Sequence, residues 1–131
     1  MFVDASAWTA ILLAEHDYKL LLGKLAAAPL VLTSAIAGWE TVRAVSRATN
    51  RSLDDAAGML ETLQRPANAR VVPIGHAEQR LALDAHARFG KGVHPAKLNM
   101  GDCFAYACAK TNGVPLLFTG DDFALTDIEP A

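Results

Sequence analysis

The sequence is poor in cysteine and lacks the long apolar runs that cross membranes. Its two cysteines, Cys103 and Cys108, lie within one predicted helix. Their spacing points the thiols toward different faces, so we expect both to stay reduced rather than form a disulfide. Lys24 and Pro29 interrupt the longest apolar stretch before the ~18 residues that a bilayer requires. Asp4 interrupts the start of the chain and no signal-like segment follows, so we expect a cytoplasmic protein without membrane attachment.

Several familiar kinds of site are also missing. The four histidines show no spacing typical of zinc ligands. Gly101 and Gly120 stand alone and match neither nucleotide-binding glycine pattern. No Ser-His-Asp or Cys-His arrangement is indicated, which argues against hydrolysis through a nucleophilic side chain. A formal charge of −2 gives the whole chain no general affinity for nucleic acid, so any such binding must be local.

What is present is a series of short apolar runs alternating with helical segments, typical of an α/β domain. We expect residues 1–131 to form a single domain with one core. The alternation predicts a three-layer α/β/α sandwich around a central parallel sheet of four to five strands. The expected strands are 1–4, 30–33, 70–73 and 114–118, with a short fifth at Ile128. The expected helices are 5–14, 17–28, 35–48, 52–64, 77 to the loop at 90–92, and 101–111.

Acidic side chains gather at the edge where a parallel sheet binds ligands. Asp4 ends the first predicted strand, and Asp121 and Asp122 follow the fourth. Asp102 lies in the first turn of a helix, where the helix dipole favours a carboxylate, and Glu40 lies in the helix after the second strand. Carboxylates gathered without a basic partner repel one another, and a hard cation such as Mg²⁺ relieves that repulsion. Such an ion also supports phosphodiester hydrolysis.

Each acid also has a simpler interpretation. Asp102 and Asp122 can cap helices or face solvent, and Glu40 can pair with Arg43 one turn later. For Asp102 or Glu40 taken singly, capping or surface pairing is the commoner role. Asp4 differs, because an acid that closes a buried strand directly before a helix is poorly placed for solvation and well placed for a ligand.

Four segments carry the most specific pattern of the chain. They are Val3-Asp-Ala-Ser-Ala7, Trp39-Glu40, Leu98-Asn-Met-Gly-Asp-Cys-Phe-Ala-Tyr-Ala107 and Leu116-Leu-Phe-Thr-Gly-Asp-Asp-Phe123. In order and spacing, over nearly the whole chain, they resemble the PIN-domain toxins called VapC. The resemblance implies the α/β/α sandwich, an endoribonuclease that depends on Mg²⁺ or Mn²⁺, inhibition by a cognate antitoxin, and a homodimer.

Carried over by position, the resemblance assigns roles to the acids. Asp4 and Asp102 correspond to metal-ligating acids, and Glu40 to a third acid that ligates directly or through water. A fourth acid corresponds to Asp121 or Asp122, which are adjacent here although many relatives separate them. We favour Asp121, because it lies two residues after a threonine. The polar residues at supporting positions are Ser6, Asn99 and Thr119.

Contacts with RNA are expected beside the acids. Arg43 and Arg47 lie on the same helical face as Glu40, where they can bind RNA phosphates next to the metal. A solvated basic face, or pairing of these arginines with Glu40, is an equally good interpretation. The resemblance implies tRNA or rRNA as the substrate, and these residues do not select between the two.

Three other functions compete with this one. A non-catalytic receiver-like domain would need an acid at the end of the third strand and a later lysine, but Pro73 ends that strand and no lysine follows Phe118. A degenerate PIN domain that only binds partners has no support, because all four acid positions are filled. A DNA-cleaving flap-type nuclease on this scaffold usually carries a helical arch, which a chain of this length lacks.

Two further expectations concern apolar surfaces. We expect the antitoxin to dock in an apolar groove between the helices around 14–25 and 42–63, with contacts from Leu21, Leu25 and Leu60. We expect Trp8 and Trp39 to be core or interface anchors rather than platforms for stacked bases.

Overall fold

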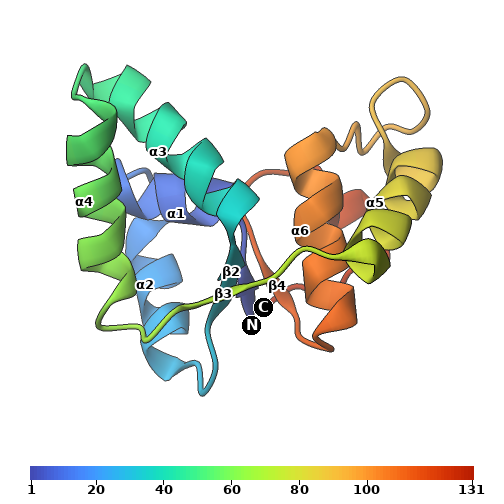
Figure 1. Cartoon of the computed structure of the whole chain (residues 1–131), viewed down its shortest axis with the longest axis horizontal. Coiled ribbons are helices and arrows are strands. Elements are labelled where there is room, and N and C mark those ends of the chain that lie inside the picture. The colour runs from blue at the N-terminus through green and yellow to red at the C-terminus, as the bar shows by residue number, and fades with distance from the viewer.

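The computed structural model describes residues 1–131 and has a parallel sheet between two layers of helices (Figure 1). Its four strands lie in the order β3-β2-β1-β4, and all three pairings are parallel. The strands are β1 (Phe2–Val3), β2 (Leu32–Ser34), β3 (Arg70–Val72) and β4 (Leu116–Leu117). The α/β/α sandwich expected from the sequence is therefore confirmed.

Six helices cover the two faces of the sheet. They are α1 (Ala5–Leu12), α2 (Tyr18–Ala27), α3 (Ala35–Thr49), α4 (Leu53–Gln64), α5 (His76–Phe89) and α6 (Met100–Thr111). In Figure 1, α1 to α4 lie on one side of the sheet and α5 and α6 on the other. A short 3-10 helix, η1 (Phe123–Leu125), follows β4. None of the helices combines the length and the hydropathy needed to cross a bilayer.

The short strands divide the core between the two faces of the sheet. Phe2 and Leu116 pack in one cluster with α5 and α6, whereas Val3 and Leu117 pack in another with α1 and α2. All four side chains are buried. Strands covered on both faces consist almost wholly of apolar residues. This is why the sequence shows continuous apolar runs here rather than alternation with polar residues.

Serine hydroxyls cap the two helices between β2 and β3. Ser34 Oγ accepts a hydrogen bond from Ala37 N at 3.1 Å, and Ser52 Oγ accepts one from Asp55 N at 3.0 Å. Each bond satisfies an amide that has no partner within the first turn of its helix. The cap at Ser34 starts α3 directly at the end of β2, which brings the first turns of α3 to the carboxyl edge of the sheet.

The fifth strand expected at Ile128 does not form. Leu116 N donates to Glu129 O at 2.8 Å and Ala131 N donates to Leu116 O at 2.9 Å, which makes a single bridge at Pro130. One isolated bridge of this kind does not make a strand. Ile128 is instead buried in the core beside α5 and α6.

The prediction of the residues that contact an antitoxin is also wrong. Leu21, Leu25 and Leu60 are buried in the core cluster shared by α1, α2 and α4. Their apolar spacing reflects packing between helices within the chain, and they are not available to a partner. Of the two tryptophans, Trp8 is a core residue as expected, whereas Trp39 is exposed.

Candidate functional site

An acidic cavity of about 340 Å³ lies at the carboxyl edge of the sheet. Four carboxyl groups line it, from Asp4, Glu15, Glu40 and Asp102, and no lysine, arginine or histidine does. The other lining residues are Ala5, Ser6, Thr9, Ala44, Asn99 and Thr119. The structure therefore brings together three of the acids and all three supporting residues named from the sequence.

Asp4 is the most deeply buried of these acids, with 3% of its surface exposed. It caps the start of α1, and its Oδ2 accepts hydrogen bonds from Ser6 N at 2.9 Å and Ser6 Oγ at 2.6 Å. Burial raises the pKa of the Asp4 carboxyl, while the bonds from Ser6 oppose that rise. Ser6 therefore orients an ionised Asp4, and no basic side chain lines the cavity beside it.

Ser6 joins two segments that are far apart in the sequence. Besides donating to Asp4, its Oγ accepts a hydrogen bond from Thr119 N at 3.1 Å. Thr119 follows β4, whereas Ser6 lies in the first turn of α1. The hydroxyl thus fixes the loop after β4 against the acid that ends β1.

Asp102 and Asn99 form a reciprocal cap at the start of α6. Asn99 Oδ1 accepts from Asp102 N at 3.1 Å, and Asp102 Oδ2 accepts from Asn99 N at 2.8 Å. Burial raises the pKa of the Asp102 carboxyl to about 7, and the nearby charges of Asp4, Asp122 and Glu40 add to the rise. Asp102 therefore does act as a cap, and it also faces the cavity with the other acids.

Glu40 reaches the cavity from α3 because α6 has a glycine at the point of approach. A Cβ atom on Gly101 would overlap the Glu40 carboxylate. Burial, followed by the charge of Asp4, raises the pKa of the Glu40 carboxyl. The sequence analysis missed Gly101 as a site residue, although its position directly before Asp102 was a signal. It also missed Thr9 and Glu15, which enter the cavity from α1 and the turn after it.

The two acids after β4 lie outside the cavity lining and are exposed. The charge of Asp122 contributes to the raised pKa of Asp102, and that of Asp121 is not among the contributing charges. The charge of Asp122 therefore acts on the Asp102 carboxyl, while the choice of Asp121 or Asp122 as the fourth acid stays a prediction.

The two arginines expected to bind RNA are exposed and do not line the cavity. The guanidinium of Arg43 lies over the Trp39 ring, 4.8 Å from its centroid. Neither Arg43 nor Arg47 forms an ion pair, so the alternative pairing with Glu40 is absent. The position of α3 that faces the cavity one turn after Glu40 is Ala44.

The donor set of the cavity fits a hard cation that retains water. No three His, Cys, Asp or Glu side chains converge closely enough to hold a metal ion by themselves. Mg²⁺ usually takes only one or two carboxylates directly and keeps several waters, so such convergence is not required. Gathered carboxylates with no cationic side chain among them favour the binding of a positively charged group.

Comparison with known proteins identifies similar chains along the full length. The PIN domain family model matches residues 1–129. The Ribonuclease VapC of Mycolicibacterium smegmatis is 38% identical, over 98% of this chain and 97% of its own. A VapC ribonuclease of Rhizobium meliloti is 37% identical, over 97% and 98%. Ribonuclease VapC42 of Mycobacterium tuberculosis is 36% identical, over 100% and 98%.

A solved structure has the same fold. The crystal structure of VapC20 from Mycobacterium tuberculosis, described as a Sarcin-Ricin loop cleaving toxin, superimposes with a TM-score of 0.79. The match covers 99% of this chain and 97% of the other at 19% sequence identity. At that identity the likeness concerns the arrangement of helices and strands.

Proposed function

Because the chain belongs to the PIN-domain family, with VapC ribonucleases among its relatives, we propose that it is an endoribonuclease that uses Mg²⁺ or Mn²⁺. The observation that carries the proposal is the acidic cavity. It gathers Asp4, Glu40 and Asp102 from three different elements and provides no cation of its own. Such an arrangement is destabilising for the protein alone and suits a site that receives a divalent ion and a polyanion together.

In this proposal each residue of the cavity has a separate task. Asp4 and Asp102 hold the ion, and Glu40 binds it directly or through water. Ser6 orients Asp4, and Asn99 orients Asp102 through its backbone N–H. A divalent ion held by these residues would supply positive charge to the phosphodiester and lower the pKa of a water molecule.

The residues around the cavity orient water and substrate. Asp122, or alternatively Asp121, is the fourth acid and holds the water that attacks phosphorus. Thr119 fixes the start of that loop through its bond to Ser6. Arg43 and Arg47, on the exposed side of α3, bind RNA phosphates that lie farther along the RNA strand from the cavity.

The biological setting belongs to the same proposal. The protein acts as the toxin of a toxin–antitoxin pair, as a single domain over residues 1–131, and is neutralised by a cognate antitoxin. It works in the cytoplasm as a homodimer, and its substrate is tRNA or rRNA. The names of its relatives, VapC ribonucleases at 36 to 38% identity over nearly the whole chain, support this assignment.

Cleavage of RNA by the purified protein tests the proposal. We expect cleavage with Mg²⁺ or Mn²⁺, none in excess chelator, and about a hundredfold loss in Asp4→Asn and in Asp102→Asn. Asp54→Asn is a matched control, because Asp54 is an exposed acid in the first turn of α4. Cleavage that survives both site substitutions, or proceeds fully in chelator, contradicts the mechanism.

A further inference from the structure

The acidic cavity extends along α1 from one end of this helix to the other. Asp4 caps the start of α1 and Glu15 follows its end, and both residues line the cavity. A helix of eight residues is about 12 Å long, so the two carboxyl groups lie at opposite ends of an elongated site. Between them the cavity is lined by Thr9 of α1 and by Ala44, one turn beyond Glu40 on α3. We call this part the outer cavity, defined by Thr9, Glu15 and Ala44.

The backbone after α1 holds Glu15 at the rim of the outer cavity. Ala14 has a φ of 52°, in the left-handed region that residues other than glycine seldom adopt. Glu15 N donates a hydrogen bond to Ala10 O at 2.9 Å, which is the bond that closes a helix when the residue after it is left-handed. The chain therefore turns back at Ala14 and is fixed there, and Glu15 lines the cavity from outside the helix.

Glu15 is separate from the group of acids to which we assign the metal ion. Three charges add to the raised pKa of the Asp102 carboxyl, and they belong to Asp4, Asp122 and Glu40. Glu15 is not among them, although it lines the same cavity. It is exposed and takes part in none of the ion pairs of the chain. Its carboxylate, which only accepts hydrogen bonds, is therefore available to a ligand that carries N–H donors.

The charges around the outer cavity determine which part of an RNA it receives. A phosphate would meet the Glu15 carboxylate there, with no basic side chain among the lining residues to attract it. Arg43 directly precedes Ala44 in the chain and Arg47 follows it by one turn, and both arginines are exposed. In the proposed function they bind the phosphates, so the RNA backbone runs along the exposed side of α3. The base of an unstacked nucleotide, which is uncharged and has N–H donors on its edge, then turns into the outer cavity.

A carboxylate distinguishes the four bases by their Watson–Crick edges. Two N–H groups side by side satisfy both of its oxygens, as in other paired contacts of carboxylates. Guanine presents N1–H beside its 2-amino group, whereas in adenine, cytosine and uracil each N–H donor lies beside an acceptor that repels the carboxylate. We propose that Glu15 binds the Watson–Crick edge of a guanine next to the cleaved phosphate and thereby determines base specificity. This inference rests on the proposed function and names the nucleotide that the site selects.

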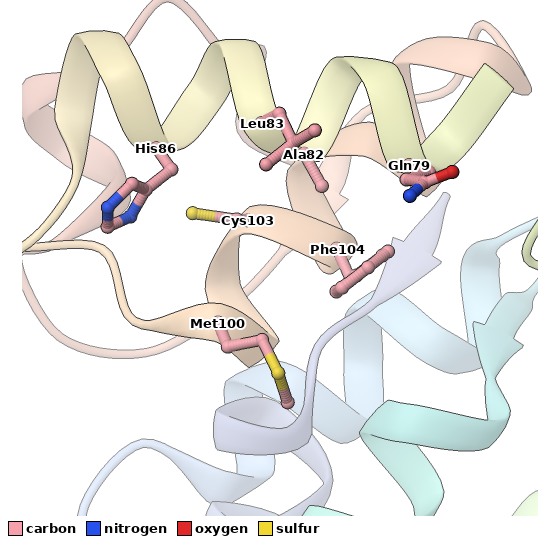
Figure 2. Close-up of a pocket in the computed structure, with 7 residues that line it drawn as sticks. All are labelled: Gln79, Ala82, Leu83, His86, Met100, Cys103 and Phe104. Carbon is pink, nitrogen blue, oxygen red and sulfur yellow. The ribbon is translucent and has the colours of Figure 1, made fainter. Parts of the chain in front are cut away.

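The groove between α5 and α6 offers no comparable group for reading a base. Its lining is mostly apolar, and in Figure 2 the polar side chains of Gln79 and His86 lie at opposite ends of it, with Ala82 and Leu83 between them. Gln79 and His86 are two turns apart on α5, roughly 10 Å, which is too far for both to meet the edge of one base. We therefore expect a base that is selected by hydrogen bonds in the outer cavity and not in this groove.

Cleavage of an RNA library with a randomised segment tests the proposal. The full chain cleaves the library in Mg²⁺, and sequencing of the products gives the base preference around each cut. We expect wild type to prefer guanine at one fixed position beside the cut. Glu15→Gln should lower this preference about tenfold to a hundredfold, the discrimination that a bidentate contact with a base provides. Glu61→Gln is the matched control, because Glu61 is also exposed and without an ion pair but lies on α4, outside the cavity.

Inosine isolates the contact itself, because it lacks only the 2-amino group of guanine. An oligonucleotide with the preferred guanine is compared with one that has inosine at the same position. The change should lower kcat/KM of wild type by about tenfold, since one hydrogen bond to a charged group is lost. It should leave kcat/KM of Glu15→Gln unchanged. A purely structural role of Glu15 would reduce cleavage of both oligonucleotides alike and lower the melting temperature.

Several results overturn the proposal. They are a wild type that cleaves without a preference for guanine, a Glu15→Gln protein that keeps the preference, and an equal effect of inosine on both proteins. If Glu15→Gln instead keeps the preference and needs a higher Mg²⁺ concentration for half-maximal cleavage, Glu15 binds a second cation and not a base.

Binding without cleavage separates this inference from the proposed function. A fluorescent oligoadenylate with a single guanine is titrated with the protein in Ca²⁺, a hard cation that also takes oxygen ligands, and then the same oligonucleotide with inosine. If wild type cleaves no RNA but binds the guanine oligonucleotide more tightly, and Glu15→Gln does not, the ribonuclease is contradicted and the guanine site stands. If wild type cleaves RNA and neither binding nor cleavage depends on guanine, the ribonuclease stands and the guanine site is contradicted.

Discussion

The carboxylate of Glu40 occupies the space that a side chain at position 101 would need, so Gly101 and Glu40 fit together as a pair. A Cβ atom on Gly101 would overlap the carboxylate itself. Gly101 belongs to the first turn of α6, next to Asp102, while Glu40 belongs to α3. The missing side chain therefore lets acids from two helices share one cavity.

Gly101→Ala should displace the Glu40 carboxylate from the cavity. We expect kcat/KM for RNA cleavage to fall about tenfold to a hundredfold, because small misplacements of catalytic groups have effects of this size. The melting temperature should change little, since the displaced atoms are the end of a flexible side chain and alanine favours the helix.

Gly58→Ala is the control for the glycine substitution. Gly58 also lies within a helix, and a Cβ atom there meets nothing within 4 Å. It should stabilise the protein by about 0.5–1 kcal/mol and leave cleavage unchanged. Full activity in Gly101→Ala would mean that the position of Glu40 does not matter. Partial recovery in Gly101→Ala with Glu40→Asp, one methylene shorter, would support the steric cause.

The metal-free protein should lose stability as pH rises toward neutrality. Burial and neighbouring acids raise the pKa of Asp102 from 3.8 to about 7 in the folded state. The stability that protonated Asp102 contributes is therefore complete below pH 3.8 and is lost as pH rises through about 7. In chelator we expect a melting temperature higher at pH 5.5 than at pH 8, by roughly several degrees.

Two changes should reduce this pH dependence. Asp102→Asn removes the titrating group, and added Mg²⁺ should raise the melting temperature more at pH 8 than at pH 5.5, because protons and the cation compete for the same carboxylates. Asp54→Asn, outside the cavity, should keep the wild-type profile. A melting temperature that rises with pH in chelator would show that these acids are not crowded.

Ser6→Ala should weaken both the fold and the site. The substitution removes the bond from Ser6 Oγ to Asp4 and leaves Thr119 N without its acceptor. We expect a loss of about 1–3 kcal/mol, since a partly buried donor is left unpaired. The pKa of Asp4 should rise further, because the Ser6 hydroxyl opposes the effect of burial. Cleavage should therefore require more Mg²⁺.

Ser46→Ala provides the comparison for Ser6. Ser46 Oγ makes one hydrogen bond, to Arg51 O at 2.7 Å, at an exposed position, whereas Ser6 Oγ makes two. Its loss should affect stability slightly and the Mg²⁺ requirement not at all. If both variants need the same Mg²⁺ concentration as wild type, Ser6 does not orient Asp4.

The sequence predicts features that neighbouring residues determine, and it does not predict features that depend on contacts between distant segments. Asp4 could be placed from its own neighbours, since a buried apolar run before it and a helix after it fix its position. The contact between Glu40 and Gly101 depends on how closely α3 approaches α6, and no local pattern encodes that distance. The sequence alone does not show whether the apolar side of α4 that carries Leu60 faces solvent or the core. The packing of α4 on α1 and α2 shows that Leu60 is buried.

The hydroxyl of Tyr106 should stabilise the end of the chain against α6. It donates to Asp127 Oδ1 at 2.7 Å, and Arg88 binds the other carboxylate oxygen at 2.9 Å. Tyr106→Phe keeps the buried ring and removes this bond, together with the longer one that the hydroxyl accepts from Arg88 at 3.4 Å. We therefore expect a loss of about 1 kcal/mol and a melting temperature lower by roughly 4 °C. Tyr18→Phe is the control, because of the two tyrosines only Tyr106 forms hydrogen bonds through its hydroxyl. Cleavage should be unchanged in both, since neither residue lines the acidic cavity. Equal melting temperatures would mean that Asp127 is held by its basic neighbours alone.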